Sequence, residues 1–347
     1  MPPTPSQCLM KPARGGGKAI APEDAMKPDP IYTALTAVTG GRHPGSGARQ
    51  DSDLPRAPKG KLKYGAAGPS HWSTFWRDFG VENQPHERCY IPGDGRHVVD
   101  RHWAHFTESL PRGAQVIDLG CGAGILGCIL LSHRGDLCVT GVDFAKVPAI
   151  ARANLTVHPW VGMEALPFGN GCFDAAVSLF GIEYGNMDET ARELGRVLKP
   201  GARFGFLVHH HESEIVREGG TRRRGLRDLL SGKMKTAFLA GDLAGFDQHR
   251  QRLGHQFPNE PSVKLFSDYF RRNIARTRAD RQAIWQKLAD DLDPELTLTM
   301  QMERSAKSIV QMGSWLVPLL SIMSAVNVSV LRRASGEPIA WDVNGYR

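Results

Sequence analysis

The chain has 347 residues, of which 41% are hydrophobic and 23% charged, a composition typical of a globular protein with a sizeable core. Its formal net charge of +7 is concentrated at the N-terminus, because residues 1–70 hold ten Lys or Arg and five Asp or Glu. The rest of the chain is nearly neutral, which argues against a basic groove for nucleic acid.

Residues 1–65 are rich in Pro and Gly and lack apolar periodicity, so we expect a disordered N-terminal extension. The N-terminus has no apolar run typical of a signal peptide. The most apolar late stretch, Gly313–Leu331, is interrupted by Ser, Pro and Asn, so we expect no membrane span and a cytoplasmic protein. The six cysteines form no C-x-x-C pair, and we expect reduced thiols and no metal site.

Two amphipathic helices are predicted before the first strand. The first begins near His71, with aromatic residues three and four positions apart, and the second covers Val98–Leu110. The aromatic residues of the first are Trp72, Phe75, Trp76 and Phe79. We interpret both helices as cover packed on a sheet. The alternative is a lid whose aromatic side chains close over a cofactor or substrate.

The stretch Gln115–Gly127 is the most informative part of the sequence. A short apolar run precedes glycines at 120, 122 and 124, and an apolar helix follows them. Such a turn lets the backbone approach a ligand at the N-terminus of the helix. Gly122–Gly127 also matches the G-x-G-x-x-G pattern of dinucleotide-binding proteins, with Asp143 at the spacing of a ribose-binding acid. The turn alone does not identify its ligand.

Strands and helices alternate after this turn. Helices are expected at roughly Ala145–Asn154 and Thr190–Leu198. Strands are expected at Leu137–Asp143, Leu155–Val157, Phe173–Phe180 and Ala202–Val208. Alternation at this spacing predicts βαβ units and a doubly wound parallel sheet with right-handed crossovers.

The C-terminal part of the chain has a different pattern. From about Glu212 to Leu298 strand signals are scarce, and a segment this long between strands predicts a helical cap rather than a loop. A helix through Met302–Met323 is then followed by strands at Asn327–Arg332 and Pro338–Val343. Two strands this close predict an antiparallel hairpin.

Several motifs occur in the order and at the spacing of one family. They are Val116–Gly124, Asp143, Glu164–Phe168, Phe173–Asp174 and Arg192–Gly201. Together they resemble the motifs of class I S-adenosylmethionine (AdoMet)-dependent methyltransferases of the broad "type 11" group. The resemblance implies an α/β fold with a mostly parallel, seven-stranded, doubly wound sheet, whose last strand is inserted antiparallel.

This interpretation divides the chain into four parts. Residues 1–65 are the extension, 70–211 the N-terminal helices and AdoMet-binding core, and 212–300 the helical cap. Residues 301–347 complete the core sheet. The resemblance places the cofactor across the carboxyl ends of the strands, where open α/β sheets bind their ligands.

The resemblance also assigns cofactor contacts residue by residue. Gly120, Gly122 and Gly124 let the backbone approach the methionine moiety, and Asp118 orients their turn. Asp143 takes both ribose hydroxyls. Further contacts are expected from Phe144, Met163, Glu164 and Leu179. Relatives often carry Asp where this chain has Gly162, so the adenine contact must come from backbone near Met163 and Glu164.

Methyl transfer needs an in-line approach of the acceptor, exclusion of water and sometimes a base. Candidate bases follow the fourth strand, at Glu183 and Tyr184, and the fifth, at His209, His210 and His211. Alternation along an extended segment brings at most one or two of these histidines to the site. We predict Glu183 and His210.

The expected activity is methyl transfer to a small-molecule acceptor under the cap. An alternative is a nucleic-acid methyltransferase, including one acting on RNA. This chain has Phe180–Glu183 where amino-methylating members carry an Asn/Asp-Pro-Pro-aromatic signature, and Cys172 precedes the strand that a cytosine-C5 nucleophile would follow. A third possibility is a non-catalytic, AdoMet-binding regulatory protein. The sequence gives no oligomeric state.

Overall fold

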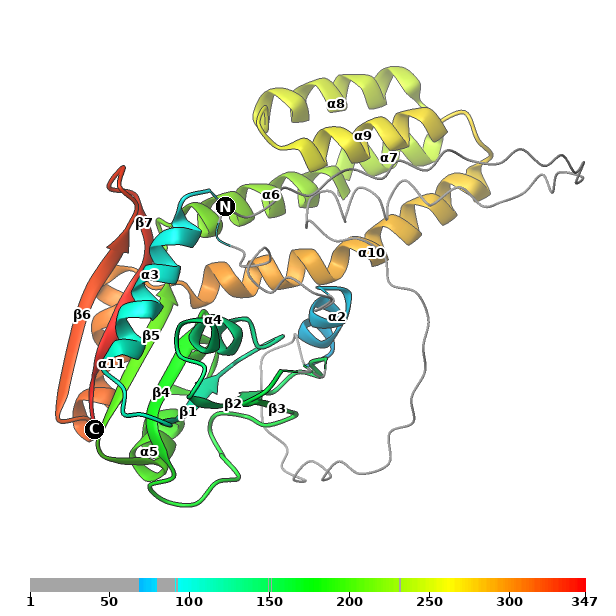
Figure 1. Ribbon diagram of the computed structural model, residues 1–347. Coiled ribbons are helices and arrows are strands. Elements are labelled where there is room, and N and C mark those ends of the chain that lie inside the picture. The colour runs from blue at the N-terminus through cyan, green and yellow to red at the C-terminus, as the bar shows by residue number, and fades with distance from the viewer. Residues whose placement is uncertain (1–68, 80–90, 92, 149, 151, 231) are drawn as a thin grey trace, which may run out of the picture.

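The computed structural model describes residues 69–79, 91, 93–148, 150, 152–230 and 232–347 (Figure 1). The predicted N-terminal extension lies outside this range. The described chain forms a sheet with helices on both faces and, beyond one end of it, a group of helices that forms the cap (Figure 1).

The sheet has seven strands in the order β3-β2-β1-β4-β5-β7-β6. Its strands are β1 (Gln115–Leu119), β2 (Cys138–Asp143), β3 (Leu155–Pro159), β4 (Phe173–Leu179), β5 (Leu198–His209), β6 (Ala325–Arg332) and β7 (Pro338–Tyr346). β1 to β5 are parallel, and β7 pairs antiparallel with both β5 and β6. The predicted fold class, including the inserted last strand, is confirmed.

Helices cover both faces of this sheet because its central strands are apolar on both sides. α3 (Gly95–Glu108) and α4 (Ile125–His133) share one core cluster with Val116 and Val177. On the other face, α5 (Met187–Val197) and α11 (Ile309–Ile322) pack against Ile117, Phe204 and Phe206. The prediction that the second N-terminal helix covers the sheet is therefore confirmed for α3.

The cap is all-helical, as predicted, and has its own core. It contains α6 (Glu214–Leu230), α7 (Gly232–Ala240), α8 (Leu243–Gln256), α9 (Pro261–Asn273) and α10 (Arg278–Ser305). Phe270 and Trp285 stack at 4.6 Å between ring centroids in the centre of this core. α10 runs from the cap to the sheet and ends at Ser305, so the expected boundary at residue 300 falls inside this helix (Figure 1).

The predicted helix Met302–Met323 is wrong as a single element. α10 ends at Ser305, and α11 begins at Ile309 with Ser308 as its N-cap in a capping box with Gln311. Between them, Lys307 N–H donates to the His209 carbonyl at 2.8 Å, which ties the interruption to the end of β5. The Ser-x-x-Gln pattern is a start signal visible in the sequence.

The predicted helix Ala145–Asn154 is also wrong, since none of the described residues there is helical. Pro148 would remove a hydrogen bond from the interior of such a helix. Asp143 also accepts a hydrogen bond from the Ala145 amide, which holds the chain in a turn directly after β2. Among the described helices, none combines the length and the apolarity that a bilayer span requires.

Candidate active site

A cavity of about 150 Å³ lies between the carboxyl ends of the strands and the cap. Four segments supply its walls: the helix α2 (Pro69–Phe79), the turn Gly120–Gly124 with the start of α4, the end of β4 and β5, and the facing sides of α6 and α10. The lining residues are Trp72, Phe75, Trp76, Asp118, Gly120, Cys121, Ile125, Leu126, Leu179, Phe180, Tyr184, His209, Ile215, Glu295, Leu298, Thr299 and Met302. Most of this wall is apolar or aromatic.

The turn Gly120–Gly124, called the glycine turn below, requires glycine for two reasons. Gly120, Gly122 and Gly124 have φ values of +66°, +52° and +70°, in the left-handed region that side chains disfavour. A Cβ on Gly120 would also lie 2.9 Å from the Gly181 Cα, so the turn after β4 packs directly on the glycine turn. The sequence pattern therefore reflects backbone geometry at the cavity floor.

Asp118 is a buried acid at the end of β1, and neither of its carboxylate oxygens has a hydrogen-bond partner among the described residues. Burial, with a smaller contribution from nearby Asp143, raises the pKa of Asp118 to about 8, while the Gly127 amide lowers it slightly. That amide lies near the carboxylate without the geometry of a hydrogen bond. Asp118 was expected to orient the glycine turn, but it makes no hydrogen bond to that turn among the described residues.

Asp143 performs the orienting role instead. Its Oδ2 accepts a hydrogen bond from the Gly122 amide at 2.7 Å, and its Oδ1 accepts one from the Ala145 amide at 2.8 Å. Burial raises the pKa of Asp143 to about 6, and these two amides limit the rise. The acid that ends β2 thus holds the glycine turn in place from the neighbouring strand.

α2 forms a side wall of the cavity and packs on α10 rather than on the sheet (Figure 1). A Cβ at Gly122 would lie 2.3 Å from Cζ2 of Trp76, so the indole rests on the glycine turn. Ser73 Oγ accepts a hydrogen bond from the Lys146 amide at 2.9 Å, which joins α2 to the loop after β2. The lid interpretation fits α2 better than the sheet-cover interpretation.

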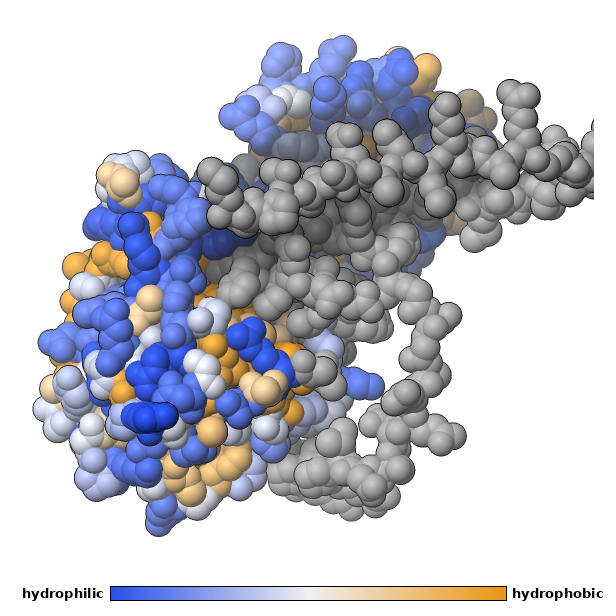
Figure 2. Space-filling model, in the orientation of Figure 1, coloured by the Kyte–Doolittle hydropathy of each residue, from blue (hydrophilic) through white to orange (hydrophobic). Residues whose placement is uncertain are grey.

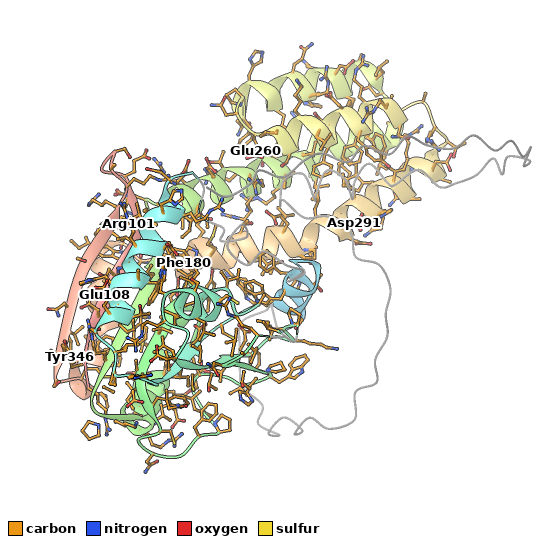
Figure 3. The ribbon with its side chains drawn as sticks, viewed as in Figure 1. Arg101, Glu108, Phe180, Glu260, Asp291 and Tyr346 are labelled. Atoms are coloured by element: carbon orange, nitrogen blue, oxygen red, sulfur yellow. The ribbon has the colours of Figure 1, made fainter. Side chains whose placement is uncertain are left out.

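A buried pair of titratable side chains stands at the ends of β4 and β5. His209 Nδ1 lies 2.6 Å from Glu183 Oε1, which also accepts the His209 backbone amide at 2.9 Å. Phe180 packs on the His209 ring at 4.2 Å between centroids and lies at the cap-facing end of the strands (Figure 3). With Nδ1 donating to Glu183, Nε2 is the ring nitrogen left to accept a proton.

Two further groups adjoin this pair. Burial lowers the pKa of the Lys307 ammonium, and the Glu183 carboxylate partly offsets that effect. Burial together with Glu183 raises the pKa of Tyr184 well above its usual value, so its phenol stays neutral. Glu183 therefore adjoins Lys307 and Tyr184 in this corner of the site, with His209 as its hydrogen-bond partner.

The structure places the other predicted residues less centrally. His210 does not line the cavity: its ring packs on Trp341 at 4.7 Å, and its Nδ1 accepts the Glu212 amide at 3.1 Å. Alternation along β5 thus presents His209 to the cavity. Glu164 accepts the Asn186 amide at 2.9 Å, beside Met163 and Gly185, outside the cavity wall. Phe144 follows Asp143 and is half-buried.

Comparison with known proteins matches the same part of the chain. A family model described as "Methyltransferase domain" matches residues 116–201, from β1 into the start of β5. The chain carries a class I AdoMet-dependent methyltransferase domain. This domain contains the glycine turn, Asp143 and Glu183, whereas α2 and the cap lie outside the matched residues.

Curated relatives of the methyltransferase domain include quinone methyltransferases. The chain is 34% identical over 125 residues to a "2-phytyl-1,4-naphtoquinone methyltransferase" of Thermosynechococcus vestitus, covering 34% of this chain and 56% of the relative. It is 36% identical over 110 residues to a "Demethylmenaquinone methyltransferase" of Mycobacterium bovis, covering 30% and 46%. The chain spans about half the length of the curated relatives it matches.

Among solved structures, a "SAM dependent methyltransferase" from Aquifex aeolicus is 18% identical over 38% of this chain and 77% of its own. Its TM-score is 0.31, too low to add to the argument. The residues of this chain do fit AdoMet: Gly120 and Asp118 line the cavity, and the Asp118 carboxylate is buried with no hydrogen-bond partner among the described residues. Among the described residues, no group of His, Cys, Asp and Glu is arranged to hold a metal ion.

Proposed function

We propose that this protein transfers the methyl group of AdoMet to an apolar, hydroxyl-bearing aromatic small molecule, with His209 as the base. The observation that carries the proposal is the His209–Glu183 pair on the wall of a cavity whose floor is the glycine turn. A base so close to a cofactor turn matches what methyl transfer to a weak nucleophile requires.

In this proposal, different core residues bind different parts of the cofactor. The glycine turn would hold the methionine portion, and Asp118, which lines the same cavity, would supply negative charge there once ionised. Asp143 and Phe144, at the end of β2, take the ribose and adenine. Asp143 can accept from the ribose while holding its two amides, because each carboxylate oxygen has two acceptor sites.

Bound AdoMet supplies an electrophilic methyl group on a positively charged sulfur. His209 accepts the acceptor's hydroxyl proton at Nε2, and Glu183 stabilises the resulting imidazolium through Nδ1–H. The released electron pair makes the oxygen, or the ring carbon beside it, nucleophilic. The new bond to the methyl group forms as the bond to sulfur breaks, and S-adenosylhomocysteine leaves. For attack by carbon, the ring then loses its C–H proton to solvent, and the oxygen recovers the proton held by His209.

The acceptor class follows from the walls of the cavity and from the relatives. Ile215, Leu298 and Met302 of the cap face the aromatic side chains of α2, so the acceptor is bound mainly by apolar contact. Quinols combine an apolar aromatic ring with an acidic hydroxyl, and two relatives bear quinone methyltransferase names. A quinol-type ring is therefore our proposed acceptor.

The test is incubation of the full chain with AdoMet carrying a labelled methyl group and with demethylmenaquinol or 2-phytyl-1,4-naphthoquinol. We expect labelled, methylated quinone in the organic extract and an equal amount of S-adenosylhomocysteine. AdoMet binding without transfer to either quinol would contradict the proposed acceptor. Transfer of label to added RNA would instead support the nucleic-acid alternative.

A further inference from the structure

The outer face of α11 is exposed and apolar. Ile309, Val310, Val317 and Leu320 have exposed fractions of 74%, 80%, 60% and 58%. They lie on one flank of α11, next to the face formed by Met312, Leu316 and Leu319, which are buried in the core. An exposed apolar stripe of this kind marks an interaction surface more often than free surface.

β6 continues this surface at the edge of the sheet. It pairs with β7 on one side and with no described strand on the other, and Val328 on it is 40% exposed. Natural edge strands are usually protected by charged residues, Pro or a bulge. Ala325–Leu331 contains no charged residue and no Pro, and the irregularity in its pairing comes only at Leu331/Arg332.

Charge is absent from α11 and from β6 as far as Leu331. From Ser308 to Leu331 the sequence has no Asp, Glu, Lys or Arg. A helix that lies on a lipid surface usually carries Lys or Arg on its polar face, which α11 lacks. A surface without charge suits apposition to an identical copy, since no like charges meet across the axis.

We propose that the outer face of α11 and the open edge of β6, together called the α11–β6 surface, bind a second copy of this chain. The two copies are related by a twofold axis, and β6 of one pairs antiparallel with β6 of the other. The backbone groups of the open edge then find partners, and the apolar stripes of the two α11 helices cover each other.

The position of this surface leaves the candidate active site open. β6 is at the opposite edge of the sheet from β3, and the cavity is formed at the strand ends that face the cap (Figure 1). Tyr346, beside β6, lies far from the cap residues Glu260 and Asp291 (Figure 3). Hydrophobic residues reach the surface at this edge of the molecule (Figure 2). Changes there therefore leave cofactor binding intact.

The test is the mass of the full chain in solution, measured by light scattering after gel filtration at about 100 μM. We expect twice the chain mass of 38.1 kDa. Val317→Glu, Leu320→Glu and Val328→Lys each place two like charges across the axis, and each should shift the dimer toward monomer. A shift of tenfold or more in the dissociation constant corresponds to about 1.4 kcal/mol.

Leu243→Glu on α8 is the matched control, because Leu243 is 46% exposed and lies in the cap. It should leave the dimer unchanged, and all variants should keep the circular dichroism spectrum of the parent and the binding of S-adenosylhomocysteine. A monomeric parent chain overturns the proposal. A dimer that survives all three substitutions also overturns it. If the monomeric parent binds phosphatidylglycerol vesicles through this surface, the surface binds lipid instead.

Discussion

The core and the cap contribute to the cavity in different ways. The core wall carries its polar groups, Asp118 and His209, on strand ends whose backbone is fixed by the sheet. The cap wall is almost entirely apolar, with Glu295 as its one acid among the described lining residues. In the proposed function, this contrast assigns the cofactor and the chemistry to the core, and recognition of the acceptor to the cap.

The two regions also differ in what holds them together. The cap has a core of its own, in which Phe238, Phe270 and Trp285 are in contact, and its cavity residues Leu298 and Thr299 lie outside that cluster. Core residues at the cavity serve the fold as well, since Asp143 holds the glycine turn. Substitutions should therefore separate function from stability in the cap more cleanly than in the core.

The largest expected effect is on the core. His209→Gln removes the proposed base while keeping an amide near Glu183, and it should lower kcat for a quinol acceptor by about 10²- to 10⁴-fold. Binding of S-adenosylhomocysteine, measured by calorimetry, should stay within about twofold of the parent. His210→Gln is the matched control, because its ring lies outside the cavity wall, and it should retain most of the activity. The reverse order of effects would assign the base to His210.

The second prediction is that Asp143→Ala affects both binding and stability. Loss of hydrogen bonds between the carboxylate and the ribose costs about 3 kcal/mol, or over a hundredfold in AdoMet affinity. The Gly122 and Ala145 amides lose their acceptor as well, so the melting temperature should also fall. Calorimetric titration and thermal unfolding measure the two effects. Unchanged AdoMet affinity would place the ribose elsewhere.

Local signals explain what the sequence predicted. The glycine turn, the strand that ends at Asp143 and the C-terminal hairpin each depend on neighbouring residues, and each is confirmed. The number of strands and the antiparallel last strand followed from the family resemblance. The capping box at Ser308 was a local signal that the long apolar pattern of the following helix obscured.

Long-range packing explains what the sequence missed. Leu298 and Met302 are ordinary residues of an amphipathic helix, and only the fold brings α10 over the glycine turn. The choice between His209 and His210 depends on the register of β5 against β7, where His209 pairs with Ala340. The hydrogen bond between Asp143 and Gly122 joins residues 21 positions apart, so its structural role was not visible.

The third prediction sharpens the division between core and cap. Leu298→Ala removes an apolar side chain from the cavity wall without touching the cap core. Loss of this contact, at about 0.8 kcal/mol per methylene, should raise the KM for the acceptor by roughly tenfold or more. AdoMet affinity should not change. Leu243→Ala, on the cap surface, is the control and should change neither value. If Leu298→Ala weakens AdoMet binding as much as it raises the KM for the acceptor, the cofactor extends under the cap.

The last prediction concerns the pH dependence of stability in the ligand-free protein. The pKa of Asp118 is about 8 in the folded state, above its usual value of 3.8, so the folded protein keeps a proton that the unfolded chain releases. The free energy of unfolding should therefore fall as pH rises from 6 to 8, and this single proton contributes at most about 2.7 kcal/mol over that range. Asp143, at about 6, adds to the slope mainly below pH 6.

Asp118→Asn removes this titration, so its free energy of unfolding should fall less than that of the parent between pH 6 and 8. The stability of the variant relative to the parent should therefore increase as pH rises. Denaturant unfolding of both proteins at pH 6 and at pH 8 measures this difference. Asp174→Asn is the control. Burial raises the pKa of Asp174, but the hydrogen bonds from Lys199 and the Gln115 amide outweigh this effect, so the pKa lies below its usual value. The stability that this group contributes is therefore lost only in acid. Its loss should leave the slope between pH 6 and 8 unchanged. A parent protein without that slope would mean that Asp118 is ionised at neutral pH, with a partner that compensates its charge.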